Sequence, residues 1–140
     1  MNDLVDLKNL VLRGQSIAPQ SVSGTVSGTG IDCTAGGAEI VVVLNIGTVA
    51  SGATGTVTIE SSLNDNTADA YAAADAYAQI NGSDEATSEY AITGADANTV
   101  VVMKCILRNE KYIRVKAVTT DAVLIAATVE SPKRVVGTVQ

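Results

Sequence analysis

Apolar residues in this chain occur in short runs rich in β-branched side chains, and this pattern restricts the fold more than any other feature. Valine and threonine number 19 and 15, and both pack well on a pleated sheet. Residues 56–61 alternate with a period of two, which predicts Val57 and Ile59 inside a core and Glu60 outside it. The longest apolar run, residues 40–44, is far shorter than the about 20 residues of a membrane-spanning helix. The sequence therefore predicts strands, and no membrane partner.

Short apolar segments recur along the whole chain, separated by turn-forming residues. About eight such segments, spaced about 8–15 residues apart, are typical of an all-β sandwich or jelly roll. We therefore predict an all-β fold, a jelly-roll-like antiparallel β-sandwich that forms a single domain over residues 14–140. Residues 1–13 are expected to form an N-terminal arm or an edge strand. The predicted strands cover residues 21–32, 38–46, 56–61, 90–93, 100–107, 113–118, 123–129 and 135–139.

Alanine dominates residues 68–80, and its high helix propensity interrupts the series of strands. This segment is predicted to form a short helix or an ordered loop inserted between strands. Further along, residues 109–110 stand where a tight turn would join strands 100–107 and 112–118 into a hairpin. Residues 119–121 have the same position before the next strand.

Charge is distributed unevenly. Residues 14–103 contain no lysine or arginine but ten acidic residues, whereas five cations fall between residues 104 and 116. On the predicted hairpin, even spacing would place several of them on one face. That face is either solvated and paired with acids of neighbouring strands, a contact surface for an acidic protein partner, or a nucleic-acid groove. The candidate contact residues are Lys104, Arg108, Arg114 and Lys116.

The residue types needed for most catalytic and nucleic-acid sites are missing. The chain has no histidine, tryptophan or phenylalanine and only four tyrosines. Histidine supplies most general acid–base and metal sites, and aromatic side chains supply the platforms on which bases stack. The net charge of −6 also has the wrong sign for a generic DNA-binding surface. We therefore expect no enzyme, no cofactor and no nucleic-acid partner.

Two weaker motifs leave that expectation unchanged. Residues 65–69 resemble the start of a calcium loop but lack its glycine and its bidentate glutamate, so no metal site is predicted. Cys33 and Cys105 have neither CxxC spacing nor a histidine partner. They are expected to be reduced, buried thiols, with a disulfide between them as the alternative.

Both ends of the chain carry aliphatic side chains that are candidates for contacts with other subunits. The first thirteen residues begin with charges among the apolar positions, so they are not expected to be a signal peptide. They either latch onto a neighbouring subunit or form the first strand of the sandwich. After Pro132 a short apolar end strand invites pairing with an identical chain or with a strand of a partner protein. The candidate residues are Leu4, Leu7, Leu10, Leu12, Val135 and Val136.

Four short motifs resemble small decoration, or cement, proteins of tailed bacteriophage heads. They are a turn with Thr29, Gly30 and Asp32, a strand with Val57, Ile59, Glu60 and Ser61, a loop with Asp65 and Asn66, and the strand 111–114. The resemblance spans roughly residues 22–128, and the alanine-rich segment departs from the family pattern.

This resemblance implies a jelly-roll-like sandwich on the outer surface of the virion capsid, made in the host cytoplasm during assembly. It implies the major capsid protein as a partner, a homodimer or homotrimer on the shell, and neither catalysis nor a cofactor. A phage tail component, such as a tube or fibre adaptor protein, is the alternative. A carbohydrate-binding module fits less well because its usual aromatic residues are missing.

Overall fold

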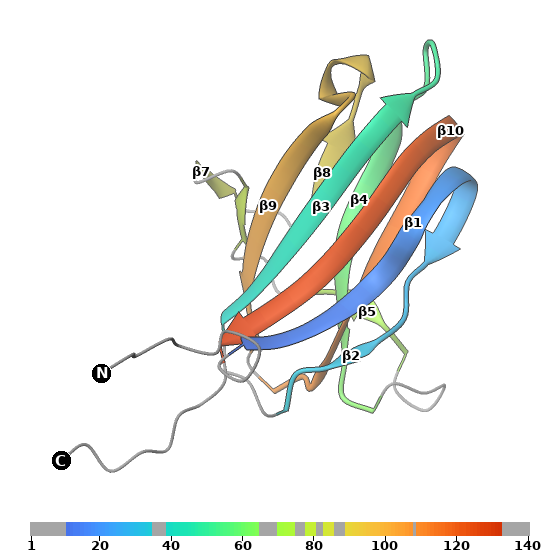
Figure 1. Ribbon diagram of the computed structural model, residues 1–140. Helices are drawn as coiled ribbons and strands as arrows, with labels where there is room; N and C mark the ends of the chain where they lie inside the picture. Colours follow the sequence, from blue (N-terminus) through green and yellow to red (C-terminus); the bar gives the residue numbers. More distant parts are fainter. Residues whose placement is uncertain are drawn as a thin grey trace, which may run out of the picture.

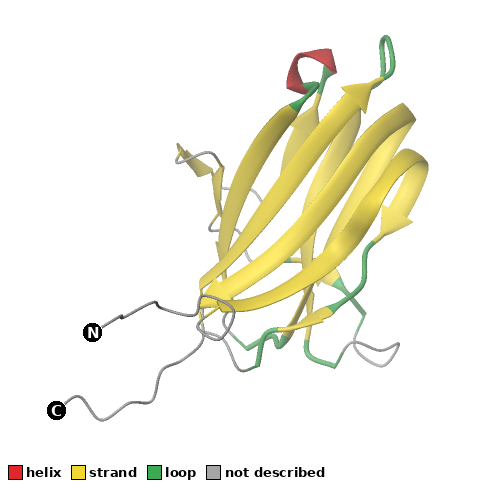
Figure 2. Cartoon of the chain, in the orientation of Figure 1, coloured by secondary structure: helices red, strands yellow, loops and turns green. Residues whose placement is uncertain are grey.

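Ten strands, all paired antiparallel, form most of the structure. The computed structural model describes residues 11–34, 39–64, 70–74, 78–80, 83–85, 89–107 and 109–132. The single helical element among these residues is a 3₁₀ turn, η1 (Gly94–Asp96). The strands are β1 (Val11–Ser27), β2 (Ile31–Asp32), β3 (Glu39–Val49), β4 (Gly55–Ser62), β5 (Ala72–Ala73), β6 (Ala78–Ile80), β7 (Ser83–Glu85), β8 (Glu89–Ile92), β9 (Thr99–Ile106) and β10 (Tyr112–Pro132). The predicted all-β, single-domain fold is confirmed (Figure 2).

The strands lie in two facing layers that share two long strands (Figure 1). In the layer that we call the β3 layer, β3 lies between β9 and residues 123–130 of β10. In the β4 layer, β4 lies between β8 and residues 112–119 of β10. Because β1 follows β10 through both layers, the two strands connect the halves of the sandwich.

The layers are joined where β1 and β10 fold over together (Figure 1). The register of the pair shifts between Val22 and Gly24, and Gly24 has a φ of 103°, which glycine adopts without strain. The Thr119 hydroxyl donates a hydrogen bond of 2.8 Å to the Val22 carbonyl across this bend. The turn predicted at residues 119–121 therefore lies within β10, which changes partners from β4 to β3 there without breaking.

Inward-facing residues of the two layers form one apolar core. Val57 and Ile59 of β4 are fully buried, as the alternation predicted, and they lie in one cluster with Ile40 and Leu44 of β3 and Met103 of β9. All five have 0% exposure. This shared core is what holds the layers face to face.

The predicted hairpin of residues 100–107 and 112–118 is wrong. β9 pairs with β3 along residues 99–106, whereas the first part of β10 pairs with β4 in the other layer. The link between them is held at the β4 layer, because the Lys111 amide donates to the Ser62 carbonyl and the Lys111 carbonyl accepts from the Cys33 amide. These hydrogen bonds place the beginning of β10 between β4 and β2, away from β9.

A short helix or an ordered loop was predicted for residues 68–80, and the helix alternative is not found in the part of that segment that the structure describes. Ala72 and Ala73 form β5 and pair with Ser61 and Glu60 of β4, and residues 78–80 form β6 beside β9. The high helix propensity of alanine is outweighed because free sheet edges offer ready backbone hydrogen bonds. The remaining residues of this segment lie outside the described ranges.

The described chain enters and leaves the sandwich at one point. β1 begins at Val11, opposite Pro132 at the end of β10, and Leu12 lies opposite Ser131. Residues 11–13 are thus the start of a strand that continues into the predicted domain.

Candidate protein-interaction surfaces

The two layers present chemically different outer faces. On the β4 layer the outward residues Glu60, Arg114 and Lys116 form what we call the charged face. On the β3 layer the outward residues form what we call the apolar face. Its members come from three neighbouring strands, β9, β3 and β10, and they are Val41, Val43, Val100, Val102, Leu124 and Ala126.

The charged face is organised around Glu60. The Arg114 side chain lies directly across from it on β10 and donates from Nε to Glu60 Oε2 at 2.6 Å. Lys116 Nζ lies 3.9 Å from the other carboxylate oxygen, and the Tyr71 ring covers Arg114 with its centroid 4.1 Å from Cζ. Only 9% of the Glu60 side chain is exposed. The expectation that Glu60 lies outside the core is therefore half right, because it points outward but is covered.

The predicted basic residues are divided between the layers. Arg114 and Lys116 share the charged face, as their spacing predicted, but Lys104 lies on β9 in the other layer, with Nζ 3.7 Å from Glu39 Oε1. Arg108 lies outside the described residues. These cations pair with acids of neighbouring strands, as one interpretation of the cluster expected, although Glu60 is covered and not solvated. A role of these cations in binding a partner stays a prediction.

The apolar side chains of this face come from three adjacent strands, and polar residues stand among them. One row of laterally paired residues contains Val102, Val43 and Thr128, and the next contains Val100, Asn45 and Ala126. Val100 is 57% exposed. This face was not predicted, although residues 40–44 are apolar at both odd and even positions, which indicates apolar side chains on both sides of that strand.

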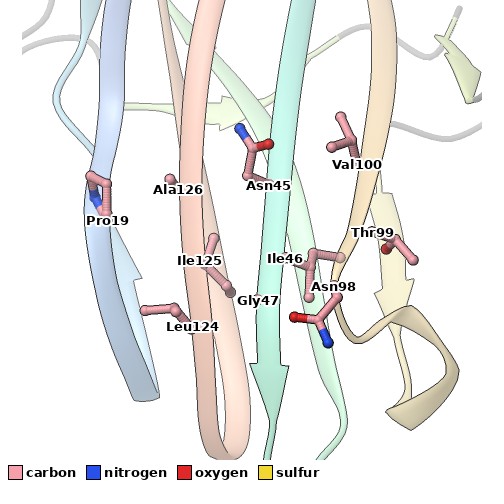
Figure 3. A pocket seen from close by; sticks show the side chains of 10 residues that line it. All are labelled: Pro19, Asn45, Ile46, Gly47, Asn98, Thr99, Val100, Leu124, Ile125 and Ala126. Atoms are coloured by element: carbon pink, nitrogen blue, oxygen red, sulfur yellow. The ribbon is translucent and has the colours of Figure 1, made fainter.

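A groove of about 460 Å³ crosses this face at the end of β3 (Figure 3). Its floor lies at Gly47, where an added Cβ would lie 2.7 Å from Leu124 Cδ2. Leu124 therefore leans over β3 because glycine leaves room for it. The groove is lined by Pro19, Asn45, Ile46, Gly47, Asn98, Thr99, Val100, Leu124, Ile125 and Ala126.

The described residues offer little reactive chemistry. Cys33 and Cys105 are free, buried thiols, and burial raises their pKa values to about 11 and about 12, so both are protonated at neutral pH. Within the described ranges no group of three or more potential metal ligands is found, and none of the helical structure is long and apolar enough to cross a membrane.

The predicted terminal contact residues are not placed. Leu4, Leu7, Leu10, Val135 and Val136 lie outside the described residues, and only the backbone of Leu12 is described, in β1.

Two solved structures share this fold. The SPBc2 prophage-derived protein YomS matches with a TM-score of 0.55 at 8% sequence identity, over 87% of this chain and 96% of its own. The PBSX exported protein XepA matches with a TM-score of 0.59 at 12% identity, over 100% of this chain and 44% of its own. The chain thus spans less than half the length of XepA. No protein-family model matches the sequence, and no curated protein sequence matches it.

Proposed function

We propose that this chain is a structural protein of a bacteriophage particle, a decoration protein that binds the outer surface of the capsid and bridges major capsid subunits. Two phage-derived proteins of the same fold support the phage assignment. The four short motifs that resemble decoration proteins support the finer one.

The observation that carries the proposal is the pairing of Val11 with Pro132. It places the two ends of the described domain side by side at one end of the sandwich (Figure 1). The sequence that precedes Val11 contains Leu4, Leu7 and Leu10, and the sequence that follows Pro132 contains a pair of valines. Two segments that carry aliphatic side chains thus continue from one end of the sandwich, which suits attachment to a neighbouring surface.

Such attachment depends more on the number of contacts than on the strength of each one. Burying one aliphatic side chain contributes about 1.5–3 kcal/mol at most, and ordering each residue costs about 1–2 kcal/mol of backbone entropy. One segment therefore binds weakly. Two segments on one domain, repeated over a symmetric shell, bind far more tightly because the second contact forms at high effective concentration.

The test uses capsids and tails, purified separately, of the phage whose genome encodes the chain. The purified protein is added to each, and bound protein is measured by sedimentation and located by electron cryomicroscopy. We expect copies on the outer capsid surface across subunit borders. A variant without residues 2–10 and 133–140 should keep its melting temperature and lose binding. Binding to tails alone would assign the chain to the tail, and binding to neither would overturn the proposal.

A further inference from the structure

The apolar face is unusual for a surface exposed to water. Val100, Val102, Ile106 and Leu124 of the β3 layer are 36–57% exposed, whereas the centre of the opposite outer face is covered by charged groups. The eight paired positions of β3 and β9 extend for about 27 Å, and the three strands of this face, about 4.8 Å apart, give a projected area of about 400 Å² that also contains Asn45, Thr128, Lys104 and Glu130. The largest exposed apolar cluster of a soluble protein is often a functional surface.

The edge of the same layer is protected against pairing with another strand. The outer strand β1 has register shifts between Gln15 and Ile17 and again between Ile17 and Gln20, and it contains Pro19, which has no amide hydrogen to donate. Bulges and proline are the usual means by which proteins block edge-to-edge association. A partner of this layer is therefore expected on its face and not along this edge.

We propose that the apolar face binds a second copy of this chain, across a twofold axis that runs along β3. Rotation about this axis places β3 on the β3 of the second copy, and β9 on its β10. Sheets packed face to face in this way lie about 10 Å apart. The inference is independent of the capsid proposal, since it concerns the free protein.

The lateral pairs make the face complementary to itself under this rotation. In one row, Val102 meets Thr128 of the second copy and Val43 meets its own counterpart. In the next row, Val100 meets Ala126 of the second copy. Val100 thus lies opposite a smaller alanine, as in layers that interdigitate, and Asn45 in the middle of this row meets its own counterpart.

The positions of the charged residues favour a twofold axis along β3 over one that runs across the strands. Lys104, Val41 and Glu130 form one row across the face. An axis along β3 places the Lys104 of each copy, whose Nζ also lies 3.7 Å from Glu39 of its own chain, opposite the Glu130 of the other copy, twice per dimer. An axis across the strands would instead place this row opposite the other end of the face, near Asn98. The residues that line the groove there are uncharged, so Lys104 and Glu130 would face no opposite charge among them. The groove itself receives Leu124 of the second copy, on the side formed by Asn98 and Val100.

The first experiment measures mass by sedimentation and light scattering from about 1 to about 100 µM, a range that covers the affinity of a small interface. We expect twice the monomer mass of 14.2 kDa. Val102→Lys should weaken the dimer by about thirtyfold or more, as expected for a charge buried at the centre of an interface. Val118→Lys is the matched control, since Val118 is a similarly exposed valine, at 43%, in the β4 layer. It should leave the dimer unchanged.

A second set of variants tests the geometry. Glu130→Lys alone should weaken the dimer, and Lys104→Glu combined with Glu130→Lys should restore it. A short bismaleimide should cross-link Asn45→Cys into covalent dimers and leave Thr25→Cys, an exposed residue of the β4 layer, as a monomer. A wild-type protein that is monomeric throughout, a trimer, equal effects of the two valine variants, or cross-linking through Thr25→Cys would each overturn the inference.

Discussion

Arg114 is the partner on which the covered charge of Glu60 depends most, so replacing it with methionine tests how the charged face is held together. Methionine keeps the apolar part of the side chain but removes the 2.6 Å hydrogen bond to Glu60 and the contact with the Tyr71 ring. A hydrogen bond to a charged group contributes about 1.5–3 kcal/mol, and a cation–π contact about 0.5–1 kcal/mol at exposed sites. Since Arg114 is itself 25% exposed, we expect Arg114→Met to lower the free energy of unfolding by about 2–3 kcal/mol.

Lys116→Met is the matched comparison on the same strand and face. Lys116 Nζ lies 3.9 Å from Glu60, and 38% of the lysine side chain is exposed. Ion pairs of this kind contribute about 0–1 kcal/mol. We therefore expect a loss of less than about 1 kcal/mol.

Urea unfolding gives both values, with an unchanged slope showing that each variant still unfolds in one step. The double variant Glu60→Gln with Arg114→Met should recover part of the stability, because no uncompensated carboxylate then stays covered. If Arg114→Met lowered the free energy of unfolding by no more than Lys116→Met, the short hydrogen bond from Arg114 to Glu60 would not stabilise the fold as argued. That result would refute the prediction.

Two further predictions concern close packing and the thiols. Gly28→Ala should lower the free energy of unfolding by about 1–3 kcal/mol, because an added Cβ would lie 2.6 Å from the Ser16 carbonyl oxygen. Gly94→Ala, whose Cβ meets nothing within 4 Å, should change it by less than about 0.5 kcal/mol, and urea midpoints compare the two. Burial raises the pKa values of Cys33 and Cys105 to about 11 and about 12, above their ordinary value of 9.0, so the stability they contribute is complete below pH 9 and lost as pH rises above it. Between pH 9 and 10 the free energy of unfolding should fall by about 1 kcal/mol per thiol. A Cys33→Ala, Cys105→Ala variant with the same pH slope as wild type would contradict this.

Local patterns in the sequence predicted the local features of the fold. The alternation around Val57 and Ile59 identified core residues, because side-chain direction in a strand depends only on position. For the same reason Arg114 and Lys116 were correctly placed on one face. The alternation also placed Glu60 outside, but whether another segment covers it depends on contacts between residues distant in the sequence.

Features that depend on which strands pair were not predictable in this way. The prediction of the hairpin was wrong because the backbone hydrogen bonds of Lys111 to β4 and to Cys33 outweigh the proximity of β9 and β10 in the sequence. The helix predicted as one alternative for residues 68–80 was wrong for the described residues, because hydrogen bonding to a neighbouring sheet edge outweighs the helix propensity of alanine. The apolar face was overlooked because a strand that is apolar on both sides looks like a wholly buried strand.

The pairing of the first described strand with the last also determines when the protein can fold during synthesis. β1 is made first, yet its partner β10 ends at Pro132, the residue opposite Val11. At about 5–20 residues per second, the ribosome needs about 6–24 s to make the intervening chain. Until then β1 lacks β10, its partner in both layers. The central strands β3 and β4 each lack the part of β10 that lies beside them. The nascent chain therefore cannot close its core in stages, and folding is expected to begin after β10 has left the ribosome.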